Sequence, residues 1–231
     1  EEVIIYNRRG VFNDTREQYQ FAIVPDFETP DWAKGAVMYQ IYTDRFCNGD
    51  PANDVETNEY FYINDNVKKV DQWDAIPETL DVGNFYGGDL QGVWDKLDYL
   101  QGLGVEVLYF NPLFVSPSNH KYDCQDYEHI DPHLTVIKND GGYVLPNKCY
   151  DNMLASKYIA RTANMENLEA SNEFFARFCE ELHRRGMKII IDGVFNHSGS
   201  FNKWMDREHI YEGQDGYEKG AFVDENSPYH T

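Results

Sequence analysis

A run of polar residues directly follows an apolar segment late in the chain. Residues 187–191 are apolar apart from one lysine, and residues 192–197 read Asp-Gly-Val-Phe-Asn-His. If the apolar run is a buried parallel strand, a carboxylate, an amide and an imidazole are delivered at its carboxyl end, the edge at which α/β folds build their sites. Each residue also has an ordinary alternative, because Asp-Gly after a strand usually forms a turn and a histidine after asparagine is usually a surface residue.

A second group of oxygen donors lies in an early loop that also contains Gly and Pro. Its members are closely spaced or return from later in the chain: Asn48, Asp50, Asn53, Asp54, Gly87 and Asp89. Hard cations such as Ca²⁺ bind about six to eight oxygens from carboxylates, amides and backbone carbonyls. The spacing is not that of an EF-hand, because Ala52 stands where a ligand should be. By spacing alone, a solvated loop rich in Asn and Asp is the more common explanation.

Alternating strands and helices are predicted to position the first group. Three apolar runs predict strands, namely 36–46, 105–110 and 187–191. Apolar residues at spacings of three and four predict helices over 89–103 and 172–185. Asn172 is expected to cap the second helix, and Gly104 and Gly186 are placed to end the two helices.

The chain is predicted to fall into three parts. Residues 1–27, with β-rich runs at 3–6 and 19–24, predict the end of an N-terminal β domain and a linker. Residues 28–197 carry the alternation of strands and helices, and 198–231 predict the start of a loop or subdomain. A complete (β/α)8 barrel needs eight units in about 250 residues, so three units here indicate long insertions, a truncated chain, or both.

Charge and composition exclude several classes of partner. The chain has 20 basic and 40 acidic residues and a formal charge of −20, which repels nucleic acid and anionic lipid head groups. We expect no membrane span and no targeting segment, because the sequence has neither a long apolar run nor a basic, apolar start. The four cysteines form no C-x-x-C pair, which argues against zinc and leaves the compartment open.

Four motifs in order resemble the α-amylase family, glycoside hydrolase family 13. Residues 36–46 resemble its first barrel strand, 87–92 the start of its first helix, 111–114 with 120–132 its second strand and following loop, and 192–197 its signature after the third strand. The resemblance implies an α/β fold, a partial TIM (β/α)8 barrel of about three β/α units. Residues 133–171 are longer than the family's usual connection and predict an inserted lobe.

The resemblance also implies roles for individual residues. Four of them match substrate-binding positions: Tyr122, His197, Asp126 and His120. Tyr122 matches a tyrosine that stacks on a sugar ring, and His197 a histidine that hydrogen-bonds the same sugar. Asp192 and Asn196 match residues that support the site. The loop at 48–54 resembles a calcium loop of neopullulanase-like members, which implies Ca²⁺ held by the six residues named above.

The implied protein is a retaining hydrolase or transglycosylase acting on starch, pullulan or cyclodextrin-type α-glucans. Retaining glycosidases need two carboxylates about 5 Å apart, and the family takes them from strands four and five. We therefore expect no catalytic nucleophile or acid/base in this chain, and no activity from the chain alone. An open strand edge predicts either self-association as a homo-oligomer or existence only as the ordered part of a longer or cleaved polypeptide. A non-catalytic glycan-binding or structural relative, and an unrelated α/β enzyme, are the alternatives.

Overall fold

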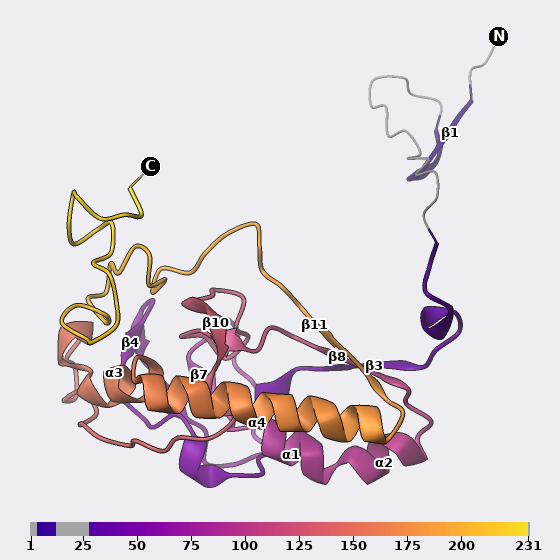
Figure 1. The fold of residues 1–231 in the computed structure, drawn as a ribbon, viewed down its shortest axis with the longest axis horizontal. Coiled ribbons are helices and arrows are strands. Elements are labelled where there is room, and N and C mark those ends of the chain that lie inside the picture. The colour runs from indigo at the N-terminus through magenta and orange to yellow at the C-terminus, as the bar shows by residue number, and fades with distance from the viewer. Residues whose placement is uncertain (1–3, 13–27, 231) are drawn as a thin grey trace. The chain divides into compact units, whose positions relative to one another are not determined.

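The computed structural model describes residues 4–12 and 28–230, and the chain divides into two compact units, Glu1–Ala36 and Val37–Thr231 (Figure 1). In the first unit, β1 (Ile5–Asn7) and β2 (Gly10–Phe12) form an antiparallel hairpin. The strand predicted at 19–24 lies outside the described residues. The predicted domain boundary after residue 27 stays a prediction.

The second unit is built on a parallel sheet of three strands: β3 (Met38–Ile41), β8 (Val107–Phe110) and β11 (Lys188–Ile191) (Figure 1). β8 is central, and Met38 and Lys188 both pair with Val107, so the carboxyl ends of the strands meet at one edge. The three predicted strands and the α/β class are confirmed. Within residues 28–230 this sheet is open rather than closed into a barrel.

Two short helices, α1 (Leu90–Asp95) and α2 (Leu97–Gly102), replace the single helix predicted over 89–103. Asp89 caps α1 by accepting a hydrogen bond of 2.6 Å from the Gly92 N–H. The backbone departs from helical geometry at Lys96, with φ −100° and ψ 5°. The apolar face nevertheless continues across the break, because Val93 and Leu97 are both fully buried.

The long helix α4 (Met165–Arg184) begins earlier than predicted. Asn164, not Asn172, is its N-cap, and the Asn164 side chain accepts from the N–H groups of Glu166 and Asn167. Asn172 lies inside the helix, where its amide accepts from the Ile130 N–H and donates to the Glu128 carbonyl. The prediction of Asn172 as the cap was therefore wrong, because that amide links α4 to a neighbouring strand.

The same turn joins helix to strand at two places. Gly104 and Gly186 have φ of +81° and +76°, a left-handed conformation that side chains disfavour. In each turn the next residue donates its N–H back into the helix, from Val105 to Leu100 and from Met187 to Leu182. Both predicted helix ends are thus confirmed.

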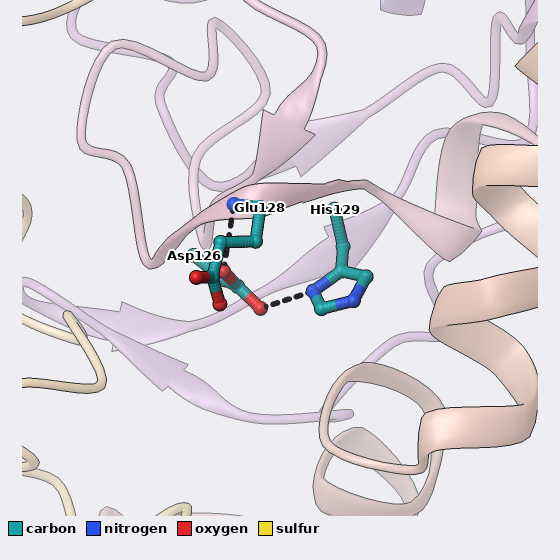
Figure 2. A group of neighbouring side chains, drawn as sticks. All are labelled: Asp126, Glu128 and His129. Carbon is teal, nitrogen blue, oxygen red and sulfur yellow. Dashed lines mark hydrogen bonds and ion pairs between the residues drawn. The ribbon is translucent and has the colours of Figure 1, made fainter.

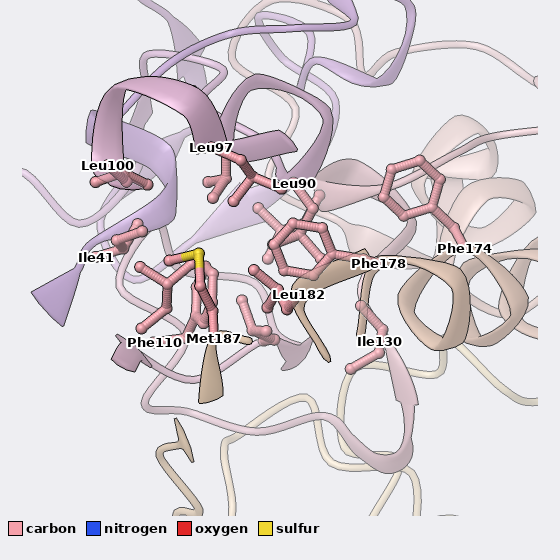
Figure 3. Close-up of a cluster of buried hydrophobic side chains, with 14 of the residues drawn as sticks. Ile41, Leu90, Leu97, Leu100, Phe110, Ile130, Phe174, Phe178, Leu182 and Met187 are labelled. Carbon is pink, nitrogen blue, oxygen red and sulfur yellow. The ribbon is translucent and has the colours of Figure 1, made fainter. Parts of the chain in front are cut away.

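The main core lies between the sheet and helices α1, α2 and α4 (Figure 3). Strand residues Ile41 and Phe110 meet Leu90 from α1 and Phe178 and Leu182 from α4, all at most 1% exposed. Burial of each such side chain contributes roughly 1.5–3 kcal/mol. Packing on this face fixes the carboxyl end of β11, which the polar residues 192–197 follow.

A second core gathers the loops and the predicted insertion. It takes side chains from β4 (Phe61–Tyr62), β7 (Asn84–Phe85), α3 (Ser156–Thr162) and the loops around them. The other short strands of this unit are β5 (Asp65–Asn66), β6 (Lys68–Lys69), β9 (Phe114–Val115) and β10 (Asp126–Ile130). Tyr60, Tyr158 and Phe201 pack together in this second core. Residues 192–230 form no helix or strand. Among the described residues, no helix combines the length and apolar character of a membrane span.

Candidate functional site

Asp192 stands at the carboxyl end of β11. Its N–H donates to the Phe110 carbonyl at 3.0 Å, which continues the pairing of the strands, and its carboxylate accepts from the Tyr122 hydroxyl at 2.8 Å. Desolvation and the Asp192 carboxylate raise the pKa of Tyr122 to about 12 and also raise that of Tyr109. Asp192 at the end of β11 thus holds a tyrosine from the loop after β8.

His197 is bonded to protein through both ring nitrogens. Asn196 Nδ2 lies 2.9 Å from His197 Nδ1, and His197 Nε2 lies 3.0 Å from the Tyr122 carbonyl oxygen. Because an amide NH₂ can only donate, His197 Nδ1 is the acceptor of the bond from Asn196. His197 Nε2 therefore carries the hydrogen and donates it in the bond to the Tyr122 carbonyl oxygen. A direct bond from His197 to a sugar therefore requires one of these contacts to be exchanged.

His120 contacts the backbone of Tyr122. Its Nδ1 accepts from the Tyr122 N–H at 3.1 Å and lies 3.2 Å from Ser118 Oγ. Desolvation lowers the pKa of His120, which favours the neutral ring that such an acceptor requires. The structure therefore brings together Tyr122, His197, His120, Asp192 and Asn196.

Asp126 is not part of this group. It is fully buried on β10, where it lies 2.7 Å from His129 Nδ1 (Figure 2). It also lies 2.8 Å from Lys203 Nζ. Burial alone would raise its pKa, but the bonds from His129 and Lys203 hold that pKa below its ordinary value. A contact between Asp126 and substrate stays a prediction, and the observed role of this carboxylate is to pair with Lys203.

Asp126, Glu128 and His129 also lie close enough to share a metal ion (Figure 2). The ammonium of Lys203 contacts both carboxylates, so each of them already has a cationic partner. We assign no metal to this cluster.

The early oxygen-donor loop does gather as predicted. Asn48 Nδ2 donates to Asp54 Oδ1 at 2.8 Å, while the Oδ1 atoms of Asn48 and Asn53 are buried without a hydrogen-bond donor. Asp54 Oδ2 pairs with Lys69 Nζ at 2.6 Å. A Cβ at Gly87 would lie within 3.0 Å of both Asp54 and Asn48, so only glycine fits there. Burial raises the pKa of Asp54 despite Lys69.

Asp89 and Asp50 complete this loop through backbone contacts. The buried Asp89 carboxylate accepts from the N–H groups of Gly92, Asp50 and Gly49. Asp50 Oδ1 accepts from the Ala52 N–H at 3.1 Å. Free oxygens on Asn48 and Asn53 fit a hard cation, whereas ligation by Asp89 or Asp50 would add to the contacts that they already make.

A buried network of charges was not predicted. His133 lies between two carboxylates, 2.8 Å from Glu59 Oε1 and 3.0 Å from Asp131 Oδ1. Lys121 pairs with the other oxygen of Asp131 at 2.7 Å, and Arg161 with the other oxygen of Glu59 at 2.8 Å. We call these five residues the His133 network. Asp131 and His133 are two residues apart, but Glu59, Lys121 and Arg161 lie elsewhere in the chain, and no spacing in the sequence signals that all five meet.

Comparison with known proteins identifies one family of similar sequences and structures. A model of the family described as "Alpha amylase, catalytic domain" matches residues 40–138 and 162–226, leaving unmatched a stretch that lies within the predicted insertion. Neopullulanase 2 of Thermoactinomyces vulgaris is 39% identical over 204 residues, covering 87% of this chain and 26% of that protein. The chain therefore spans about a quarter of this relative.

Two solved structures share the fold. The type III pullulan hydrolase from Thermococcus kodakarensis has a TM-score of 0.59 and 27% identity, covering 98% of this chain and 33% of that one. The cyclic α-maltosyl-(1→6)-maltose hydrolase from Arthrobacter globiformis, in complex with that sugar, has a TM-score of 0.53 and 30% identity, covering 80% of this chain and 30% of that one.

Proposed function

Since the chain belongs to the α-amylase family, glycoside hydrolase family 13, we propose that it is part of a retaining α-glucan hydrolase or transglycosylase. The observation that carries the proposal is the group of Tyr122, Asp192 and His197 at the carboxyl ends of β8 and β11. Substrates of the starch, pullulan or cyclodextrin type are proposed, because a pullulan hydrolase and a hydrolase bound to a cyclic maltosyl sugar share the fold.

In this proposal, Tyr122 offers its ring to the apolar face of a sugar. Asp192 fixes the Tyr122 hydroxyl, and His120 fixes the Tyr122 backbone, so that the ring is held in place before substrate arrives. His197, oriented by Asn196, exchanges its contact with the Tyr122 carbonyl for one with a sugar hydroxyl. Asp126 supports the loop through Lys203.

We also propose one structural calcium ion in the early loop. Asn48, Asn53 and Asp54 would supply side-chain oxygens, and Gly87 its carbonyl, with Asp50 and Asp89 as the remaining ligands. The ion would supply charge that ties the loop after β3 to the start of α1. The unpartnered oxygens of Asn48 and Asn53 support this site.

Kinetics of an active protein that contains this chain test the site. Tyr122→Ala and His197→Ala are each expected to lower kcat/KM on maltooligosaccharides more than tenfold, because their contacts strengthen as the sugar ring flattens. Tyr143→Ala, at a tyrosine 83% exposed on the inserted lobe, is the matched control and should keep normal kinetics. Unchanged kinetics in the first two variants would remove both residues from the site.

The 231 residues alone are expected to bind sugar without cleaving it, because positioning without a nucleophile and a proton donor gives little rate enhancement. Incubation with maltooligosaccharides and a nitrophenyl maltoside checks this. Release of nitrophenol that scales with the chain and disappears in Asp192→Asn would contradict it. Binding without turnover in every longer form would favour the non-catalytic alternative.

We also propose self-association through β3, where Met38 is 46% exposed.

A further inference from the structure

Lys121 is a buried lysine that the function proposed above does not use, although it directly precedes Tyr122 in the chain. It is only 3% exposed, and lysines are almost never fully buried unless they are paired. Its backbone is also unusual, because φ is +63°, in the left-handed region that a long side chain disfavours. Such a conformation persists only where the surrounding structure holds it in place.

The Lys121 ammonium is held by groups that follow β9 and β10. It donates to the Ser116 carbonyl oxygen at 2.8 Å and to Asp131 Oδ2 at 2.7 Å. The same Asp131 oxygen accepts from the Ser116 N–H at 3.1 Å. The Lys121 N–H donates to Ser118 Oγ at 3.0 Å, so the backbone and the side chain of this residue are both anchored.

Asp131 is itself fixed in place. It is fully buried, and its Oδ1 accepts from the His133 N–H at 2.9 Å and lies 3.0 Å from His133 Nδ1. Its own N–H donates to the Leu113 carbonyl oxygen at 2.9 Å. A buried ion pair is costly to break, because each charge would be left without a partner. Asp131 therefore holds the Lys121 ammonium, and with it the left-handed turn at residue 121.

This turn determines where Tyr122 lies. The peptide bond between the two residues is planar, so the dihedral angles of Lys121 set the direction in which Tyr122 follows. From this direction the Tyr122 N–H reaches His120 Nδ1 at 3.1 Å, and the Tyr122 hydroxyl reaches Asp192 Oδ2 at 2.8 Å. A change of φ at Lys121 to the ordinary negative range would redirect Tyr122 relative to both partners.

We propose that Lys121 is a positioning residue for Tyr122, because its buried ion pair with Asp131 maintains the turn that presents the tyrosine ring to the sugar. The inference rests on the proposed function, in which Tyr122 contacts substrate and Lys121 does not. A misplacement of about 1 Å in a substrate-positioning group can lower a rate on the order of 100-fold. The ion pair thus acts on catalysis only through the tyrosine.

Kinetics on maltooligosaccharides test the inference in an active protein that contains this chain, through a double-mutant cycle. Lys121→Met keeps an apolar stem without the ammonium and should lower kcat/KM about tenfold. In the Tyr122→Ala background the same change should cost less than about twofold, because no ring is left to position. A merely structural role would lower kcat/KM by the same factor in both backgrounds.

Lys157→Met is the matched control. The Lys157 side chain is 14% exposed and pairs with Glu56 at 2.8 Å and with Asp140 at 3.4 Å, but it belongs to the inserted lobe. This change should leave kcat/KM unaltered in both backgrounds.

A second variant serves if Lys121→Met does not fold. Lys121→Met combined with Asp131→Asn leaves neither charge of the pair buried alone, so it should fold and lose the effect of the Tyr122 ring in the same way. Normal kcat/KM in folded Lys121→Met, or an equal loss with and without the Tyr122 ring, overturns the positioning role and leaves the proposed function standing. Wild-type kinetics in Tyr122→Ala overturns both.

Discussion

The His133 network and the loop at 48–54 are both buried and polar, yet they satisfy their polar atoms differently. In the network, each carboxylate oxygen of Glu59 and Asp131 has a cationic partner. In the loop, the Oδ1 atoms of Asn48 and Asn53 have no donor. Buried polar groups cost free energy unless they are paired. The network is therefore complete within the chain, whereas the loop leaves oxygens for a cation from solution.

The largest effect is expected from breaking the network. Glu59→Ala should lower the free energy of unfolding by about 3–5 kcal/mol, because it leaves His133 and Arg161 buried without that carboxylate. Chemical denaturation measures this. Glu173→Ala, at an exposed glutamate of α4, is the control and should change stability by less than about 0.5 kcal/mol. A small loss in Glu59→Ala would mean that the network is not sealed from water.

A smaller, ligand-dependent effect is expected at the loop. Calcium at about 100 times its dissociation constant should stabilise the chain by about 2.7 kcal/mol, and EDTA should remove that gain. Asn53→Ala should abolish the response, while Asn64→Ala, at an exposed asparagine, should keep it. Calorimetry and thermal unfolding measure both effects. If wild-type unfolding ignores both calcium and EDTA, the calcium site is withdrawn.

Removing Lys69, a side chain that competes with calcium for Asp54, should strengthen calcium binding at the loop. Lys69 pairs with Asp54 Oδ2, an oxygen proposed for calcium. Lys69→Met should therefore tighten calcium binding several-fold, because like charges no longer compete for Asp54. Lys68→Met, at the neighbouring exposed lysine paired with Asp65, is the matched control. Equal calcium affinity in both variants would show that Lys69 does not occupy the ion's position.

The smallest effect expected is on the pH dependence of stability. Burial opposes charge on His133, but Glu59 and Asp131 raise its pKa above 6.5. The stability that charged His133 contributes is therefore complete below pH 6.5, and it is lost as the pH rises through the pKa of His133 in the folded state. Lys121 and His133 lower the pKa of Asp131 despite its burial, so its contribution is lost as pH falls. Stability should thus decline on both sides, and His133→Gln should remove the alkaline decline. An alkaline decline that survives in His133→Gln would assign it to another group.

Sequence patterns predicted what depends on local spacing. The strands and the glycine turns at 104 and 186 follow from periodicity and from turn chemistry, whereas the roles of Tyr122 and Asp192 were implied only by the resemblance to the α-amylase family. The partners of Asp126 were not predicted, because Lys203 comes from a loop 77 residues away in a segment without pattern. The start of α4 was misplaced because Asn172 and Asn164 are equally good caps by type, and only contacts with β10 distinguish them.

The pairing order of the sheet has a consequence for the time course of folding. β8 pairs with β3 and β11, whose residues lie about 70 and 80 positions away along the chain, and such distant contacts slow folding. At roughly 5–20 residues per second of synthesis, β3 exists for on the order of 10 s before β11 is made. During that interval β3 has no complete sheet to join. Folding of the sheet in the cell therefore depends on how quickly the ribosome makes β8 and β11.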